Sequence, residues 1–129
     1  MRYRLAVLTL ALSATVAAAS PMSGDDIRAN IAGRAVYLAV PLGGEFPLNY
    51  RPGGKVDGNG EALGLGRYLS PTDTGRWWIS GDQLCQRFTK WYDGAASCFR
   101  LTRTGPRSLS WVRDNGQTGT ARIGAPVSD

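Results

Sequence analysis

The chain contains no histidine among its 129 residues. Histidine is the base of Ser-His-Asp and Cys-His nucleophile systems, a ligand of the common zinc sites, and the usual general base near neutral pH. Its absence excludes these sites. We therefore predict no enzymatic activity, no catalytic residue, no metal site and no cofactor.

Carboxylate pairs could still support hydrolysis, provided that two acids face one cleft. The acidic residues fall instead in segments where we expect turns, and turn formation is their predicted role. These residues are Asp57, Glu61, Asp73, Asp82, Asp93 and Asp114. Residues 57–61 space oxygen atoms like the start of a calcium loop, but Ala62 and Tyr68 stand where the EF-hand pattern has glycine and glutamate, so we expect a glycine-rich turn.

The chain also lacks an apolar run of about 18 residues, the length that a membrane-spanning helix needs. Residues 5–16 are apolar apart from small hydroxylated residues, follow Arg2 and Arg4, and precede three alanines at 17–19. This order is typical of a cleaved export signal. We predict a signal peptide over residues 1–19, cleavage before Ser20, and a periplasmic or secreted mature chain with no transmembrane span.

Lysine is scarce, since only Lys55 and Lys90 occur in the chain, against eleven arginines after residue 19. The net charge is +5 for the whole chain and +3 without the two arginines of the signal. Scattered arginines indicate a solvated surface, and the alternative is a basic face for an anionic glycan, a lipid head group or an acidic partner. We expect no nucleic-acid partner for an exported chain.

Cysteine is limited to Cys85 and Cys98. In an oxidising compartment such a pair favours a disulfide, and its closed ring contributes about 3 kcal/mol in the chain-entropy model. A two-residue turn at Asp93-Gly94 would leave the two sulfur atoms too far apart. We therefore expect a longer loop over residues 90–95, which brings the cysteines opposite each other and presents Trp91 and Tyr92 at its tip.

A short helix is expected near the start of the mature chain. Ser23 suits the N-cap position, the acidic pair after it suits the positive helix end, and Ile27 and Ile31 share one face. Gly33 would end the helix.

Beyond Gly33, short runs rich in β-branched and aromatic residues alternate with glycine-bearing turns, which is typical of antiparallel β structure. We predict one mainly β domain over residues 20–129, a meander of about six to eight short strands that forms a small barrel or curled sheet, closed at one end by the helix. The predicted strands are residues 35–40, 46–51, 63–69, 75–80, 83–90, 97–102, 108–114 and 119–123. Turns are expected at residues 52–54, 57–60, 80–82, 93–94, 104–106 and 115–116.

Strand alternation separates core positions from exposed ones. Trp77 and Ile79 share the predicted inner face, whereas Trp78 lies on the outer face between arginine and serine. The same alternation places Leu84 and Phe88 inward, and Leu109 with Trp111 inward.

Exposed aromatic residues beside cations are candidates for binding a sugar ring or a protein partner, because Trp, Tyr and Arg dominate interface energetics. Packing in the core or at a hairpin tip is the alternative. The candidate residues are Trp78, Trp91, Tyr92, Arg76, Arg87 and Lys90. An envelope protein or an anionic glycan is the expected partner.

The order of motifs along the chain resembles that of a family of small exported proteobacterial proteins that carry a domain of unknown function. The pattern runs through Ser23-Gly24-x-x-Ile27, Gly33, Asp57-Gly58, Gly75-x-Trp77-x-Ile79, Asp82-x-Leu84-Cys85, Cys98 and Gly116. The resemblance implies export and β architecture, and it assigns no catalytic residue.

The G-x-W segment, the two cysteines and an exposed tail over residues 20–23 are also similar to periplasmic inhibitors of secreted metalloproteases. We accordingly expect a non-catalytic exported binding or interaction domain, with a periplasmic inhibitor of a hydrolase or protease as the alternative.

Overall fold

The computed structural model describes residues 2–12, 19–41, 43–60 and 71–129. These residues form nine β-strands, one α-helix and one 3-10 turn. The helix α1 spans Gly24–Ile31, and the 3-10 turn η3 spans Trp91–Gly94. The strands are β1 (Ser20–Pro21), β2 (Arg34–Ala39), β3 (Glu45–Tyr50), β4 (Lys55–Asn59), β5 (Thr72–Ser80), β6 (Gln83–Phe88), β7 (Ala96–Arg103), β8 (Ser108–Arg113) and β9 (Thr118–Pro126). The strand predicted over residues 63–69 lies outside the described residues.

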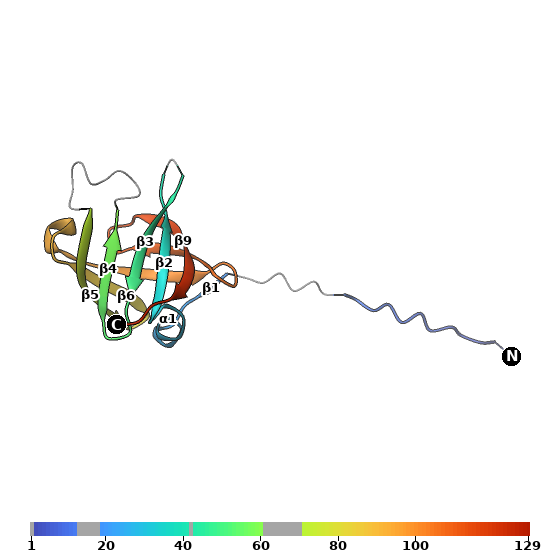
Figure 1. Ribbon diagram of the computed structural model, residues 1–129. Coiled ribbons are helices and arrows are strands. Elements are labelled where there is room, and N and C mark those ends of the chain that lie inside the picture. Colours follow the sequence, from blue (N-terminus) through green and yellow to red (C-terminus); the bar gives the residue numbers. More distant parts are fainter. Residues whose placement is uncertain (1, 13–18, 42, 61–70) are drawn as a thin grey trace.

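Strands β2 to β9 form a closed antiparallel barrel (Figure 1). Each of the eight strands pairs with the next one along the chain, and the ring closes where β9 pairs with β2. Closure leaves none of these eight strands with an unpaired edge. The prediction of a mainly β meander forming a small barrel is confirmed.

The two ends of the barrel differ. At the sealed end lie α1 and the turns that join β3 to β4, β5 to β6, and β7 to β8 (Figure 1). At the open end the chain passes from β2 to β3, from β6 to β7 through η3, and from β8 to β9.

The helix α1 closes the sealed end, as predicted. Ser23 is its N-cap, and a capping box joins Ser23 to Asp26 in both directions. Ile27 and Ile31 are 0% and 1% exposed and point into the barrel core. The Gly24 N–H donates to Asp82 Oδ1 at 2.9 Å, which ties the first turn of the helix to the β5–β6 turn.

The inner face of the barrel follows the predicted alternation. Trp77 is 6% exposed and belongs to the core, whereas Trp78 is 40% exposed on the outer wall. The Trp77 Nε1–H donates to the Arg51 backbone oxygen at 2.8 Å, so its one polar atom is satisfied. Burying the indole ring while pairing its N–H is the arrangement that a core tryptophan needs.

Cys85 and Cys98 are direct cross-strand partners on β6 and β7, with an S–S distance of 2.08 Å. The predicted disulfide and the predicted long loop between these strands are confirmed. Within the part of the chain that is described, no cysteine is left free.

The segment before α1 is attached to the barrel. Ser20 and Pro21 are exposed but pair with Arg103 and Thr102 of β7. Met22 is 4% exposed, and its N–H donates to the Leu101 oxygen at 2.9 Å. Residues 2–12 extend away from the barrel, and the helices of the described chain include none long and apolar enough to cross a membrane (Figure 1).

The prediction of a turn over residues 57–60 is wrong, because β4 runs through residues 55–59. Gly58 occupies an inward position of that strand, where a Cβ would lie 2.7 Å from a Leu48 methyl carbon and 2.8 Å from the Trp91 ring. The glycine is therefore needed for close packing rather than for a turn. Asp57, on the opposite face of β4, is a strand residue and not a turn former.

Candidate functional site

A cavity of about 810 Å³ lies at the open end of the barrel. Its size is in the range of small-molecule sites, and eight-stranded barrels are wide enough to hold one small ligand. Besides the exposed Tyr92, five aromatic rings line it, namely Phe46 of β3, Phe88 of β6, Trp91 of η3, Phe99 of β7 and Trp111 of β8. Apart from Phe88, these rings are only partly buried, so they present apolar surface to whatever enters.

Trp91 reaches this cavity because the loop after β6 folds back over the barrel. Its ring centre lies 4.8 Å from that of Phe88 and 5.3 Å from that of Phe46. The ring also covers Gly58, where the missing side chain leaves room. The expectation that Trp91 stands at an exposed loop tip is wrong, because its ring is partly buried against the core. Contact with the Phe46 and Phe88 rings removes apolar surface of Trp91 from water, which favours this position.

A buried carboxylate holds this loop in place. Asp73, on β5, is 6% exposed and accepts hydrogen bonds from the backbone N–H groups of Thr74, Lys90 and Trp91 at 2.7–2.9 Å. Burial acts to raise the pKa of Asp73, but the three N–H donors outweigh it and hold the pKa below its usual value. Asp73 was predicted to form a turn, and it lies instead within β5 and anchors the loop that carries Trp91.

The two residues after Trp91 have left-handed backbone conformations. Tyr92 and Asp93 have φ values of 57° and 54°, a region that is costly for residues with a side chain. Tyr92 is 60% exposed, and the Arg113 guanidinium carbon lies 4.6 Å from the centre of its ring. The loop is thus held by Asp73 on one side and by a cation–π contact on the other.

One residue that lines the cavity, Gln86, belongs to a buried polar pair. Tyr50 donates its hydroxyl hydrogen to Gln86 Oε1 at 2.7 Å, and Gln86 is 6% exposed. Burial raises the pKa of Tyr50, which keeps the hydroxyl protonated. Gln86 lines the cavity, and its amide nitrogen has no acceptor among the described residues, so it can donate to a ligand.

Arg113 is a charged residue on the inner wall of β8. It continues the inward series of Leu109 and Trp111 on β8 and lines the cavity. Its Nη2 donates to Ser97 Oγ at 2.7 Å and its Nη1 to Gln117 Oε1 at 3.1 Å. Neutral oxygen atoms therefore orient the guanidinium.

The six predicted binding residues divide between two surfaces. Lys90, Trp91 and Tyr92 line the cavity at the open end. Trp78, Arg76 and Arg87 lie together on the outer wall of β5 and β6.

On that wall Arg76 pairs directly with Arg87, and Lys55 pairs directly with Arg76. Like charges in this register repel each other, although exposure to water weakens the effect. Binding of an envelope protein or an anionic glycan by these residues stays a prediction.

Several residues that line the cavity were not among the predicted binding residues. Arg113 could have been found, because the alternation that placed Leu109 and Trp111 inward reaches Arg113 two residues later. Phe46 and Phe99 offered no such signal, because their importance depends on which end of the barrel each strand position occupies.

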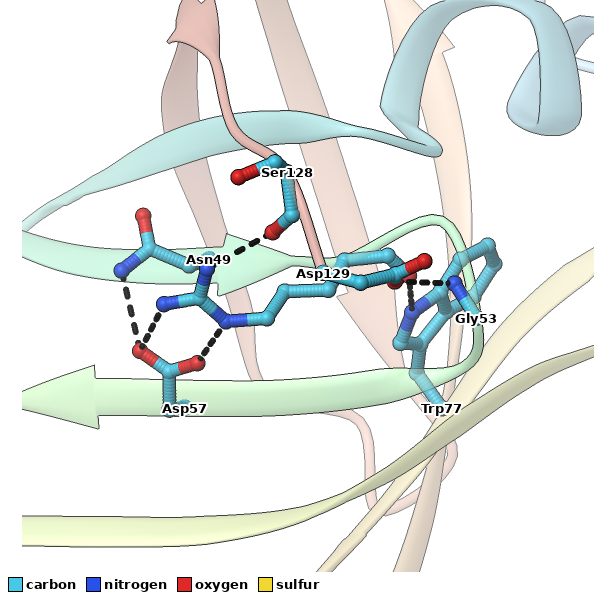
Figure 2. A network of polar contacts seen from close by, with 7 residues as sticks. Asn49, Gly53, Asp57, Trp77, Ser128 and Asp129 are labelled. Carbon is cyan, nitrogen blue, oxygen red and sulfur yellow. Dashed lines mark hydrogen bonds and ion pairs between the residues drawn. The ribbon is translucent and has the colours of Figure 1, made fainter.

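A separate polar network fixes the chain end against the outer face of β3 and β4 (Figure 2). Arg51 Nε donates to Asp57 Oδ2 at 2.5 Å, and Arg51 Nη1 donates to the Ser128 oxygen at 2.7 Å. Asp129 accepts from the Gly53 N–H at 2.7 Å. Burial acts to raise the pKa of Asp57, yet hydrogen bonds from Arg51 and Asn49 hold it below its usual value. These contacts are structural, because the carboxylate of Asp57 is already paired.

Among the residues described, no three Cys, Asp or Glu side chains come together as metal ligands would. The fold and the cavity define a class, the closed up-and-down barrel with an aromatic cavity at one end. Comparison of the chain with protein-family models, with curated proteins and with solved structures finds no match.

Proposed function

We propose that this protein is an exported, non-catalytic binding domain that holds a small, largely apolar ligand at the open end of its barrel. The observation that carries the proposal is the cavity of about 810 Å³ and the six aromatic residues that line it. Such rings supply large contact areas at little loss of side-chain entropy.

Export is supported by the pattern of residues 1–19 together with the disulfide, since disulfides persist in oxidising compartments. Among residues 2–12 the large apolar side chains, such as Leu5 and Leu12, are 78–91% exposed. These side chains do not pack against the barrel, and contact between the chain and the barrel begins where Ser20 pairs with Arg103. Amino-terminal sequencing of the protein from its own cells should give Ser20 as the first residue, and a chain that still starts at Met1 would contradict export by cleavage.

Binding is supported by the contrast between apolar rings and few polar groups in the cavity. Gln86 offers an amide donor, and Lys90 and Arg113 supply cations. Apolar lining with a small number of placed polar groups is the usual composition of a small-molecule site.

The experiment uses N-phenyl-1-naphthylamine, an uncharged probe whose fluorescence rises when it leaves water. We expect saturable binding by the oxidised protein with one site per barrel. Trp91→Ala should weaken binding strongly, because it removes a ring from the cavity. Trp78→Ala is the matched control, since it removes the same side chain from the outer wall. Equal loss of binding in both variants, or no saturable binding in the wild type, would overturn the proposal.

A further inference from the structure

Arg113 holds a positive charge on the inner wall and forms no ion pair with a carboxylate of the described residues. The ion pairs of the described residues involve Arg51 and Arg122, and none involves Arg113. A partly buried cation without a counter-charge is unfavourable, because it loses water without gaining an ionic partner. Asp93 also lines the cavity, but it is exposed and lies beyond ion-pair distance of Arg113.

The hydrogen bonds of Arg113 are also incomplete. A guanidinium has five N–H donors. Arg113 forms two hydrogen bonds, to Ser97 and to Gln117, and its Nε is buried without an acceptor among the described residues. Buried donors normally have a partner, so an unpaired one calls for an explanation.

The second buried donor without a partner lies on the same strand. Within the described part of the chain, Trp111 Nε1 and Arg113 Nε are the buried side-chain atoms that lack a hydrogen bond. Both residues line the cavity from the inner face of β8. Gln86 adds an amide donor, and Lys90 adds a second cation. The side chains that line the cavity therefore include two cations, Lys90 and Arg113, against one carboxylate, Asp93, and this balance suits a ligand that brings acceptors and negative charge.

We propose that the ligand is an amphiphilic carboxylic acid, whose carboxylate binds Arg113 while its apolar part lies against Phe46, Phe99 and Trp111. This inference rests on the proposed function and names the chemistry of its ligand. The planar guanidinium matches a carboxylate in shape and charge. Ser97 and Gln117 hold the guanidinium in position before the ligand arrives, so little side-chain entropy is lost on binding.

The test compares dodecanoate with dodecan-1-ol as competitors of N-phenyl-1-naphthylamine, both below their micelle concentrations. The two differ in the head group and share the apolar chain. A charge-assisted hydrogen bond should make dodecanoate the stronger competitor by about tenfold or more. Dodecyl phosphate, as a third competitor, distinguishes a carboxylate site from a general anion site. A phosphate that competes better than dodecanoate would overturn the choice of a carboxylate.

Variants assign the preference to one residue. Arg113→Met keeps most of the side-chain length and removes the charge, so we expect dodecanoate to lose its advantage while dodecan-1-ol competes as before. Arg100→Met, on the exposed outer face of β7, is the matched control and should leave the advantage intact. Loss of the advantage in both variants would assign it to overall charge and overturn the proposal.

A measurement on the wild-type protein tests the same contact without depending on the folding of a variant. The NMR signal of the Arg113 Nε–H should shift on addition of dodecanoate and not on addition of dodecan-1-ol. If the probe binds but acid and alcohol compete equally, the carboxylate inference fails and the proposed function stands. If the probe does not bind, the proposed function itself fails.

Discussion

The sealed end and the open end of the barrel are built from the same strands, yet they are filled in different ways. At the sealed end, α1 inserts Ile27 and Ile31, which are almost fully buried. At the open end, aromatic side chains such as Phe46 and Trp111 occupy the equivalent inward positions but remain partly exposed. The helix fills the space between the strands at the sealed end, whereas at the open end the inward side chains of the strands leave a cavity.

This difference between the two ends indicates that the sealed end contributes mainly to stability and the open end mainly to binding. The sealed end buries apolar surface and pairs its polar groups through the capping box and the Gly24 contact with Asp82. The open end keeps aromatic surface partly exposed, and the buried Arg113 Nε there has no acceptor among the described residues. We therefore expect substitutions at the sealed end to change the free energy of unfolding, and substitutions at the open end to change ligand affinity.

The largest expected effect is a difference in stability between substitutions of Trp77 and Trp91. Trp77→Ala should lower the free energy of unfolding by about 3–5 kcal/mol, because a buried ring is replaced by a void. Trp91→Ala should lower it less, since that ring is only partly buried. Urea denaturation of the oxidised protein measures both. Trp78→Ala serves as the exposed control and should cost least. Equal losses for Trp77→Ala and Trp78→Ala would contradict the inward and outward assignment.

The next effect concerns the helix that closes the sealed end. Ile27→Ala should lower the free energy of unfolding by about 2–5 kcal/mol, as for other large-to-small core substitutions. Its affinity for N-phenyl-1-naphthylamine should stay near that of the wild type under conditions where the variant is folded. Phe46→Ala should show the reverse balance, with a smaller stability loss and a weaker affinity. A common loss of affinity in both would mean that the two ends are not independent.

A third prediction concerns the anchor of the loop at the open end. Asp73→Ala should lower the free energy of unfolding by about 1–3 kcal/mol, because three backbone N–H groups lose a charged acceptor. Probe affinity should fall as well, because Trp91 loses its support. Asp93→Ala, on the same loop but exposed, is the control and should change stability little.

Asp73 also predicts a dependence of stability on pH. Its pKa in the folded protein lies below the usual value of 3.8, so its contribution is fully present above that value. The contribution is lost as the pH falls through the folded pKa. The stability difference between the wild type and Asp73→Ala should therefore be constant near neutral pH and shrink in acid. A difference that grows in acid would show that the shift has the opposite sign.

The smallest expected effect tests the start of α1. Ser23→Ala removes the side-chain acceptor of the capping box and should cost about 1 kcal/mol. Ser80→Ala, at an exposed strand end, is a matched control. Thermal or urea unfolding of both variants measures the difference, and no measurable loss in Ser23→Ala would show that the cap contributes nothing to the sealed end.

Local patterns in the sequence were sufficient for several elements. The N-cap and the spacing of Ile27 and Ile31 predicted α1, and alternation predicted that Trp77 is buried and Trp78 exposed. These features depend on neighbours along the chain. The disulfide required one further step, a loop long enough to bring Cys85 opposite Cys98, and β6 and β7 have that register.

Local patterns failed where a distant segment decides the outcome. Glycines and acids over residues 57–60 resemble a turn, but the strand persists because Gly58 lies beneath Trp91. Asp73 resembled a turn former, yet its partners are the N–H groups of residues 90 and 91. Trp91 looked like an exposed tip because nothing in its own loop reveals Phe46 across the barrel.

The sequence by itself determined the helix, the strand character, the inward and outward faces and the disulfide pair, because each follows from side-chain periodicity or from a cysteine count. Only the tertiary structure decided that the strands close into a barrel, that one end is filled and the other open, and that Arg113 shares a cavity with Trp91 and Phe46. Periodicity specifies which face a side chain occupies, whereas its neighbours on other strands depend on register and closure, which are properties of the whole chain.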